Sequence, residues 1–300
     1  MPAVVMNGVF PIIQTPFDRK GRIITEMLQK QVEWLIECGV DGVGIAMGSE
    51  IYKFIDDERD NVLKSVVEQV RGRVKVVMNT GAEGTEAAIY YSTRAEKFGA
   101  DALMVRPPAL FIPSQIDCEN YFKKIAQSVS IPIFMQDQIP TPVAPALAAA
   151  CAKSHKNLRY IKVESQPTVP RMSQTHKAAE GTGLILFGGA GGTFVLEEFR
   201  RGSVGTMPHS TFADFFVRIW RFWKRGDIGA AETEFNRFLP ILNIMLQGPG
   251  LTEWIAKFIM AKRGILDMNA AEVRHPGRKP DDAQFREIEI HLEGLDLVNN

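Results

Sequence analysis

The sequence predicts an α/β protein, a (β/α)8 TIM barrel with a C-terminal helical extension. Eight short apolar runs alternate with longer amphipathic segments between residues 8 and 207. Strands that alternate with helical patterns indicate parallel β-α-β units, and eight such units indicate a closed barrel. From about residue 227 onward the patterns are helical only. We therefore expect a barrel over residues 1–226 and a helical segment over residues 227–300 that packs on it.

The predicted strands are short runs of β-branched, aromatic and other apolar residues, which is the composition of buried strands. An open doubly wound sheet is the main alternative fold. It normally has fewer strands and a glycine-rich turn after the first one, where this chain has Gln14-Thr15-Pro16. In chain order, strands are expected at residues 8–13, 42–46, 74–78, 102–105, 132–135, 158–164, 184–187 and 203–207.

The predicted helices between these strands carry apolar residues at helical spacing, such as Leu28, Val32 and Leu35 before the second strand. In the C-terminal extension, turn signals at residues 248–250 and 275–277 separate the helical patterns. Helices are expected there over residues 230–246, 251–263 and 281–292.

Composition excludes several classes of protein. Lysine plus arginine equals aspartate plus glutamate, at 35 each, so no charge excess indicates a nucleic-acid or membrane-surface partner. The three cysteines are widely spaced and form no CxxC motif, which argues against a disulfide framework or a zinc site. The N-terminus lacks the pattern of a signal peptide, and no run of eighteen apolar residues occurs. A cytoplasmic location is therefore expected.

Lys162 is the most informative residue, because it lies in the middle of an apolar run that is predicted to be a buried strand. An unpaired ammonium is costly to bury. Desolvation lowers the pKa of a lysine, and the neutral amine can then attack a keto group to form a Schiff base. Glu164 is two residues further on, so both side chains share one face of the strand. The alternative is a structural Lys–Glu ion pair, since such pairs also perturb pKa values.

Other candidates follow from the rule that active sites of these barrels lie at the C-terminal ends of the strands. Gly48 and Ser49 follow the second predicted strand, and their backbone N–H groups and hydroxyl suit a carboxylate, although an ordinary turn is the simpler explanation. Gln136 and Asp137 follow the fifth strand, where they either orient substrate hydroxyls or cap the strand.

Two further positions come from the seventh and eighth predicted strands. Gly188 and Gly189 open a glycine-rich segment, which indicates close approach of the backbone to a ligand or to neighbouring loops. His209 follows the eighth strand and is a weaker candidate for proton transfer. No cluster of histidine, cysteine and carboxylate residues has the spacing of metal ligands, so we expect no metal.

Taken together, these motifs resemble the dihydrodipicolinate synthase / N-acetylneuraminate lyase superfamily over nearly the whole chain. The resemblance implies a barrel that binds pyruvate or another 2-keto acid as a Schiff base on Lys162. It also implies a homo-oligomer, commonly a tetramer, and no cofactor. The matching segments are Gly8–Pro11, Thr15–Phe17, Gly39–Gly42, Gly48–Glu50, Gly99–Ala102, Pro107-Pro108, Ile131–Ile133 and Ile161-Lys162.

The chain departs from the synthases at several motif positions. Gln136 stands where the synthases and many lyases have a tyrosine, so the proton relay of the synthase is absent and lysine biosynthesis is disfavoured. The segments Gln136-Asp137, Lys162–Ser165 and Arg274–Pro276 instead resemble the 2-keto-3-deoxy-L-arabonate dehydratase branch.

The resemblance thus implies a hydro-lyase acting on a 2-keto-3-deoxy sugar acid. Lys162 would form the imine and Glu164 would remove a proton from C3. Gly48 and Ser49 would hold the C1 carboxylate, and Gln136 would orient a hydroxyl or a water. A retro-aldolase that releases pyruvate and a synthase-like condensation are alternatives. A non-catalytic 2-keto acid binding protein is the alternative from another class.

Overall fold

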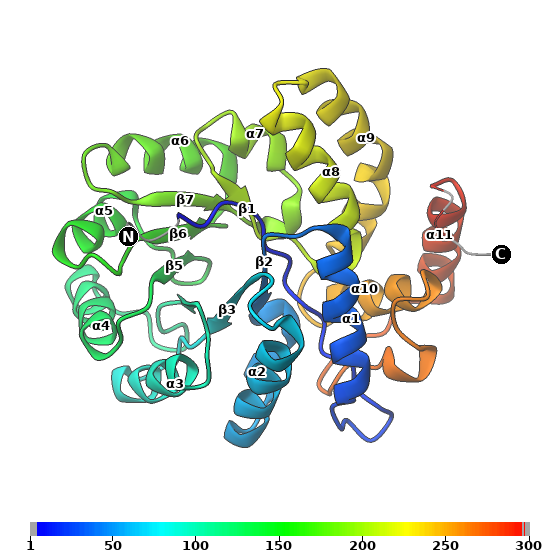
Figure 1. Ribbon diagram of the computed structural model, residues 1–300, viewed down its shortest axis with the longest axis horizontal. Coiled ribbons are helices and arrows are strands. Elements are labelled where there is room, and N and C mark those ends of the chain that lie inside the picture. The colour runs from blue at the N-terminus through cyan, green and yellow to red at the C-terminus, as the bar shows by residue number, and fades with distance from the viewer. Residues whose placement is uncertain (1–4, 296, 298–300) are drawn as a thin grey trace. The chain divides into compact units, whose positions relative to one another are not determined.

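The computed structural model describes residues 5–295 and residue 297, and Figure 1 shows its helices and strands. Along these residues, each of eight strands is followed by a helix, and three more helices come after the last of these pairs. This element order is that of a (β/α)8 barrel with a helical extension, and it confirms the predicted fold class. The strands are β1 (Gly8–Val9), β2 (Gly42–Ile45), β3 (Lys75–Asn79), β4 (Ala102–Val105), β5 (Ile133–Asp137), β6 (Tyr160–Val163), β7 (Ile185–Gly188) and β8 (Gly205–Thr206).

The helices alternate with these strands as the amphipathic segments predict. α1 ends at Gly39, whose left-handed backbone (φ 86°) closes the helix with N–H bonds to the carbonyls of Leu35 and Ile36. The helices are α1 (Thr25–Cys38), α2 (Asp56–Val70), α3 (Thr85–Lys97), α4 (Gln115–Ser128), α5 (Pro145–Ser154), α6 (Thr168–Ala179), α7 (Val195–Phe199), α8 (Ala213–Lys224), α9 (Ile228–Met245), α10 (Leu251–Lys262) and α11 (Asp282–Glu293).

The chain forms two compact units. The first comprises the described part of Met1–Phe10 together with Lys75–Met207. Its strands lie in the order β1-β8-β7-β6-β5-β4-β3, and every described pair is parallel. In a doubly wound sheet the order of the strands reverses beside the first strand. Here β3 to β8 are neighbours in chain order, and β1 pairs with β8. This order fits a barrel and excludes the doubly wound alternative.

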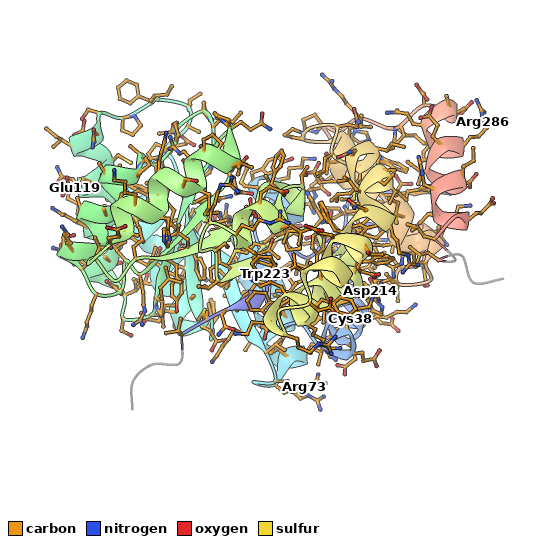
Figure 2. All side chains as sticks on the ribbon, turned by 90° about the horizontal axis from the view of Figure 1, so that it is seen from above. Cys38, Arg73, Glu119, Asp214, Trp223 and Arg286 are labelled. Atoms are coloured by element: carbon orange, nitrogen blue, oxygen red, sulfur yellow. The ribbon has the colours of Figure 1, made fainter. Side chains whose placement is uncertain are left out.

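The core of the first unit consists of apolar side chains from these strands. Nearly every strand residue is buried, as expected for parallel strands covered on both faces. The rings of Phe134 and Tyr160 stack with centroids 4.4 Å apart, and Phe187 packs edge-on against Phe134. Helices α4, α5 and α6 flank the strands (Figure 1). Figure 2 shows Glu119 at the surface of α4, where it pairs with Lys123 at 2.6 Å.

The second unit comprises Pro11–Val74 and the described part of Pro208–Asn300. In it, α8 and α9 lie side by side (Figure 1), and Phe238 packs against Phe212, Phe215 and Phe216 with centroid distances of 4.8–5.4 Å. The boundary predicted at residue 227 falls between these two helices. Cys38 lies beside Asp214 (Figure 2), and burial, assisted by the Asp214 charge, raises the pKa of this thiol to about 12.

Most strands differ in extent from the prediction by one to four residues, and the first and fifth differ most clearly in where they end. The run from Gly8 to Ile13 forms a continuous strand only over Gly8–Val9. Pro11 has no N–H to donate, and beyond it Ile12 pairs with Gly44 as an isolated bridge. The fifth strand is longer than predicted and ends at Asp137, so Gln136 and Asp137 lie within it and do not follow it. Among the helices of residues 5–295, none is long and apolar enough to cross a bilayer.

Candidate active site

Lys162 and Glu164 contact each other in the first unit. Lys162 Nζ lies 2.9 Å from Glu164 Oε1, and both side chains are largely buried, with 4% and 11% of their surface exposed. Lys162 belongs to β6, and Glu164 follows its end while its N–H still bonds to the Asp137 carbonyl at 2.9 Å. The extended backbone therefore continues past the strand and keeps both side chains on one face.

Two side-chain amides form a hydrogen-bonded chain that ends at Glu164, Asn79 from β3 and Gln136 from β5. Gln136 is paired with Lys162 in the register of β5 and β6. Its Nε2 donates to Glu164 Oε2 at 2.9 Å, and its Oε1 accepts from Asn79 Nδ2 at 3.0 Å. Gln136 and Asn79 are both 1% exposed. Since Asn79 can orient the Gln136 amide, the carboxylate of Glu164 is held by directed donors.

The backbone after β7 supplies a third donor. The Ala190 N–H bonds to Glu164 Oε1 at 3.1 Å, and Ala190 adopts a left-handed backbone (φ 47°) that is uncommon for a residue with a side chain. A Cβ atom at Gly189 would lie 2.8 Å from the carboxyl carbon of Glu164. Gly189 thus allows the Glu164 side chain to lie directly against the backbone. The group that lies against the Gly189 backbone is thus the side chain of Glu164.

Asp137 is also buried, but other partners surround it. Arg171 donates two hydrogen bonds to its carboxylate, at 2.8 and 2.9 Å. The Ser165 hydroxyl donates at 2.7 Å and the Val143 N–H at 2.9 Å. Four donors account for the burial of this charge, and a substrate would have to displace one of them. The substrate-binding role of Asp137 stays a prediction.

Gly48, Ser49 and His209 belong to the second unit. Ser49 is buried, its hydroxyl donates to the Ile13 carbonyl at 2.6 Å and accepts from the Ala46 N–H at 3.1 Å. A Cβ atom at Gly48 would lie 3.0 Å from the His209 ring, so glycine permits this close packing. The carboxylate-binding role of Gly48 and Ser49 and the weaker role of His209 stay predictions.

Two residues of the first unit, Asn79 and Glu198, belong to this group of side chains but were not predicted from the sequence. Asn79 ends β3, and the rule on strand ends could have indicated it. Glu198 lies in the short helix α7, is 0% exposed, and interacts electrostatically with Lys162 and Glu164. The sequence of α7 has two adjacent glutamates and does not indicate which of them is buried. Within the described chain, no group of three histidine, cysteine, aspartate or glutamate residues could hold a metal ion.

Known proteins resemble this chain along its whole length. The model of the dihydrodipicolinate synthetase family matches residues 5–289. An L-2-keto-3-deoxyarabonate dehydratase from Azospirillum brasilense is 26% identical over 97% of this chain and 96% of its own. A 4-hydroxy-tetrahydrodipicolinate synthase from Methanococcus aeolicus is 32% identical over 98% of this chain and 100% of its own. A crystal structure of dihydrodipicolinate synthase superposes with a TM-score of 0.90 at 25% identity, covering 98% of this chain and all of that one.

Proposed function

This chain belongs to the dihydrodipicolinate synthetase family, and we propose that it dehydrates a 2-keto-3-deoxy sugar acid through a Schiff base on Lys162. Members of the family are lyases, so the chain is an enzyme of that class. The observation that carries the proposal is the 2.9 Å contact between the buried Lys162 amine and the Glu164 carboxylate.

The proposed reaction begins when the Lys162 amine attacks the C2 ketone and water leaves, which gives a protonated imine. The imine acidifies C3, Glu164 removes a C3 proton, and the electron pair moves into an enamine. The enamine expels the C4 hydroxyl group, which departs as water with the proton that Glu164 collected. A positioned carboxylate of this kind typically contributes roughly 10²–10⁴-fold to the rate. Hydrolysis of the imine returns Lys162 and releases a 2-keto acid with a C3–C4 double bond. A proton then moves from C5 to C3, and the resulting enol takes its carbonyl form, which gives the semialdehyde.

The residue beside this carboxylate favours dehydration over carbon–carbon bond cleavage. A retro-aldolase must deprotonate the C4 hydroxyl group, and an amide such as Gln136 cannot exchange a proton at neutral pH. Its contact with Glu164 at 2.9 Å suits it to orient a substrate hydroxyl or a water. The name of the A. brasilense relative points the same way, at 26% identity.

A synthase-like condensation is the second candidate, because the M. aeolicus synthase is more similar in sequence, at 32% identity. Both candidates use the imine on Lys162, so imine formation alone does not separate them. The reactions do separate them, since dehydration turns a 2-keto-3-deoxy acid into a 2-keto semialdehyde, whereas a condensation consumes pyruvate. The third alternative, retro-aldol cleavage, releases pyruvate.

The test is a screen of 2-keto-3-deoxy acids that measures semialdehyde and pyruvate in the same reaction. We expect semialdehyde from at least one substrate, no activity in Lys162→Ala, and full activity after treatment with a chelator. Pyruvate as the sole product would overturn the dehydratase assignment in favour of the aldolase. The homotetramer implied by the resemblance stays a prediction, which light scattering on the purified protein checks.

A further inference from the structure

Glu198 is a fully buried carboxyl group that no step of the proposed reaction uses. It lies in α7 within the first unit and is 0% exposed. Neither of its carboxyl oxygens has a hydrogen-bond partner of good geometry among the described residues, although the Gly189 N–H is near enough to favour the charged form in part. A buried ionised carboxylate without partners is strongly disfavoured, so such a position selects the neutral acid.

The Gly188-Gly189 backbone separates this carboxyl from Glu164. A Cβ atom at Gly188 would overlap Glu198 Oε2, and one at Gly189 would lie 2.8 Å from Glu164 Oε1. The two glycines therefore form a thin layer of backbone with one carboxyl group packed on each residue. Larger side chains here would push the two groups away from this backbone. This packing explains why both positions are glycine, and the explanation does not require a bound ligand.

The charged groups that act on Glu198 come from two elements. Lys162 and Glu164 approach from β6 and the residue after it, and Glu197 is its neighbour on α7. Burial raises the pKa of Glu198 to about 8, the Glu164 charge adds to this effect, and the Gly189 N–H and the Lys162 charge offset part of it. The pKa and the geometry agree that the acid is neutral at pH 7.

The titratable residues of α6, which also packs against α7, have partners of their own or lie at its C-terminal end. Arg171 is bound to Asp137, and His176 packs against Gly202. Lys177 lies in the last turn of α6. Among the charges that act on Glu198, those of Glu164 and Lys162 therefore have a larger effect than that of Glu197.

We propose that Glu198 is a positioning residue, held as a neutral acid behind Gly188 and Gly189, and that it keeps the Lys162–Glu164 pair free of a second negative charge. The inference rests on the proposed function, because it concerns imine formation at Lys162. While Glu198 is neutral, one ammonium faces one carboxylate. When Glu198 ionises, the added negative charge stabilises the ammonium form of the lysine. Less neutral amine is then available to attack the ketone.

The experiment measures the rate at which pyruvate is trapped on Lys162 by cyanoborohydride, as a function of pH. In the wild-type protein, we expect ionisation of Glu198 to hold this rate down above pH 8. Glu198→Gln keeps the size of the side chain and cannot ionise, so it should trap faster than wild type at pH 9. The expected difference is roughly ten-fold, because a nearby opposite charge changes the proton affinity of a group by a factor of about ten or more. At pH 6 the two proteins should trap at similar rates.

Glu197→Gln is the matched control, because Glu197 is the next residue of the same helix but is 38% exposed and paired with Arg200. It should follow the wild-type profile. Glu198→Leu is a second variant of similar size, which suits a site without a hydrogen-bond partner and should follow the profile of Glu198→Gln. A role in folding alone would change protein yield and leave the shape of the pH profile unaltered.

Infrared difference spectra give a readout that does not depend on trapping. Wild type at pH 7 should show the carbonyl band of a protonated carboxylic acid, and Glu198→Gln should lack it. Absence of this band in wild type overturns the inference. Trapping with identical pH profiles in wild type and Glu198→Gln also overturns it and leaves the proposed function intact. Failure of wild type to trap pyruvate at any pH overturns the proposed function and, with it, this role of Glu198.

Discussion

Replacing Glu198 by glutamine should stabilise the protein, and the gain should grow with pH. In the unfolded chain this carboxyl titrates near its ordinary value of 4.5, whereas burial raises its pKa to about 8 in the folded protein. Between these values the folded state keeps a proton that the unfolded state has lost. Stability falls with rising pH wherever the folded state binds more protons, so Glu198 destabilises the fold progressively from pH 4.5 to about 8.

The magnitude follows from the width of this window. It spans about 3.5 pH units, and at about 1.4 kcal/mol per unit it corresponds to roughly 5 kcal/mol. The penalty is absent below pH 4.5 and complete above about 8. Because glutamine is neutral throughout, Glu198→Gln should escape this penalty. Other titrating groups contribute equally to both proteins and cancel in the difference.

Urea unfolding of wild type and Glu198→Gln at a series of pH values from 4 to 9 measures this difference. The free energy of unfolding of Glu198→Gln, relative to wild type, should rise with pH and level off near pH 8. Glu197→Gln should show no such trend, because Glu197 is exposed. Parallel curves for wild type and Glu198→Gln would mean that Glu198 is ionised in the folded protein, contrary to the burial described above.

Three further substitutions test the proton-transferring carboxylate, the glycine packed against it and a buried ion pair. Glu164→Gln should still trap pyruvate but lose dehydration by roughly 10²–10⁴-fold, and near-normal turnover would place the base elsewhere. Gly189→Ala should displace Glu164, which it would contact at 2.8 Å, and lower turnover at least roughly ten-fold, whereas Gly84→Ala has open space and should not. Lys257→Met should cost about 3 kcal/mol of unfolding free energy in urea titrations, because it leaves the buried Glu50 carboxylate short of a partner. Adding Glu50→Gln should recover part of that loss, and an additive effect of the two changes would contradict the pairing.

The eight strands could be predicted from the sequence because their signal is local. Each is a short apolar run between helical patterns, and such runs need no tertiary information to recognise. The contact between Lys162 and Glu164 followed from the two-residue period of extended backbone, and the side chains meet at 2.9 Å. The chemical roles of both residues stay predictions.

Positions that depend on packing between elements could not be predicted. Glu198 approaches Glu164 only because α7 packs on β7 and two glycines leave room between the carboxyl groups. Sequence spacing does not tell which residue of a short helix faces inward. Asn79 was not predicted for a similar reason, since its role depends on a hydrogen bond to Gln136 on another strand. The extent of the first strand was overestimated, because the apolar run outweighed the effect of Pro11.

Mapping the pyruvate adduct identifies the lysine that forms the Schiff base. The protein is incubated with pyruvate and borohydride, digested, and analysed by mass spectrometry. We expect one modified lysine, Lys162, and no adduct in Lys162→Ala. An adduct on another lysine, or no adduct under conditions where an active 4-hydroxy-tetrahydrodipicolinate synthase reacts, would contradict it.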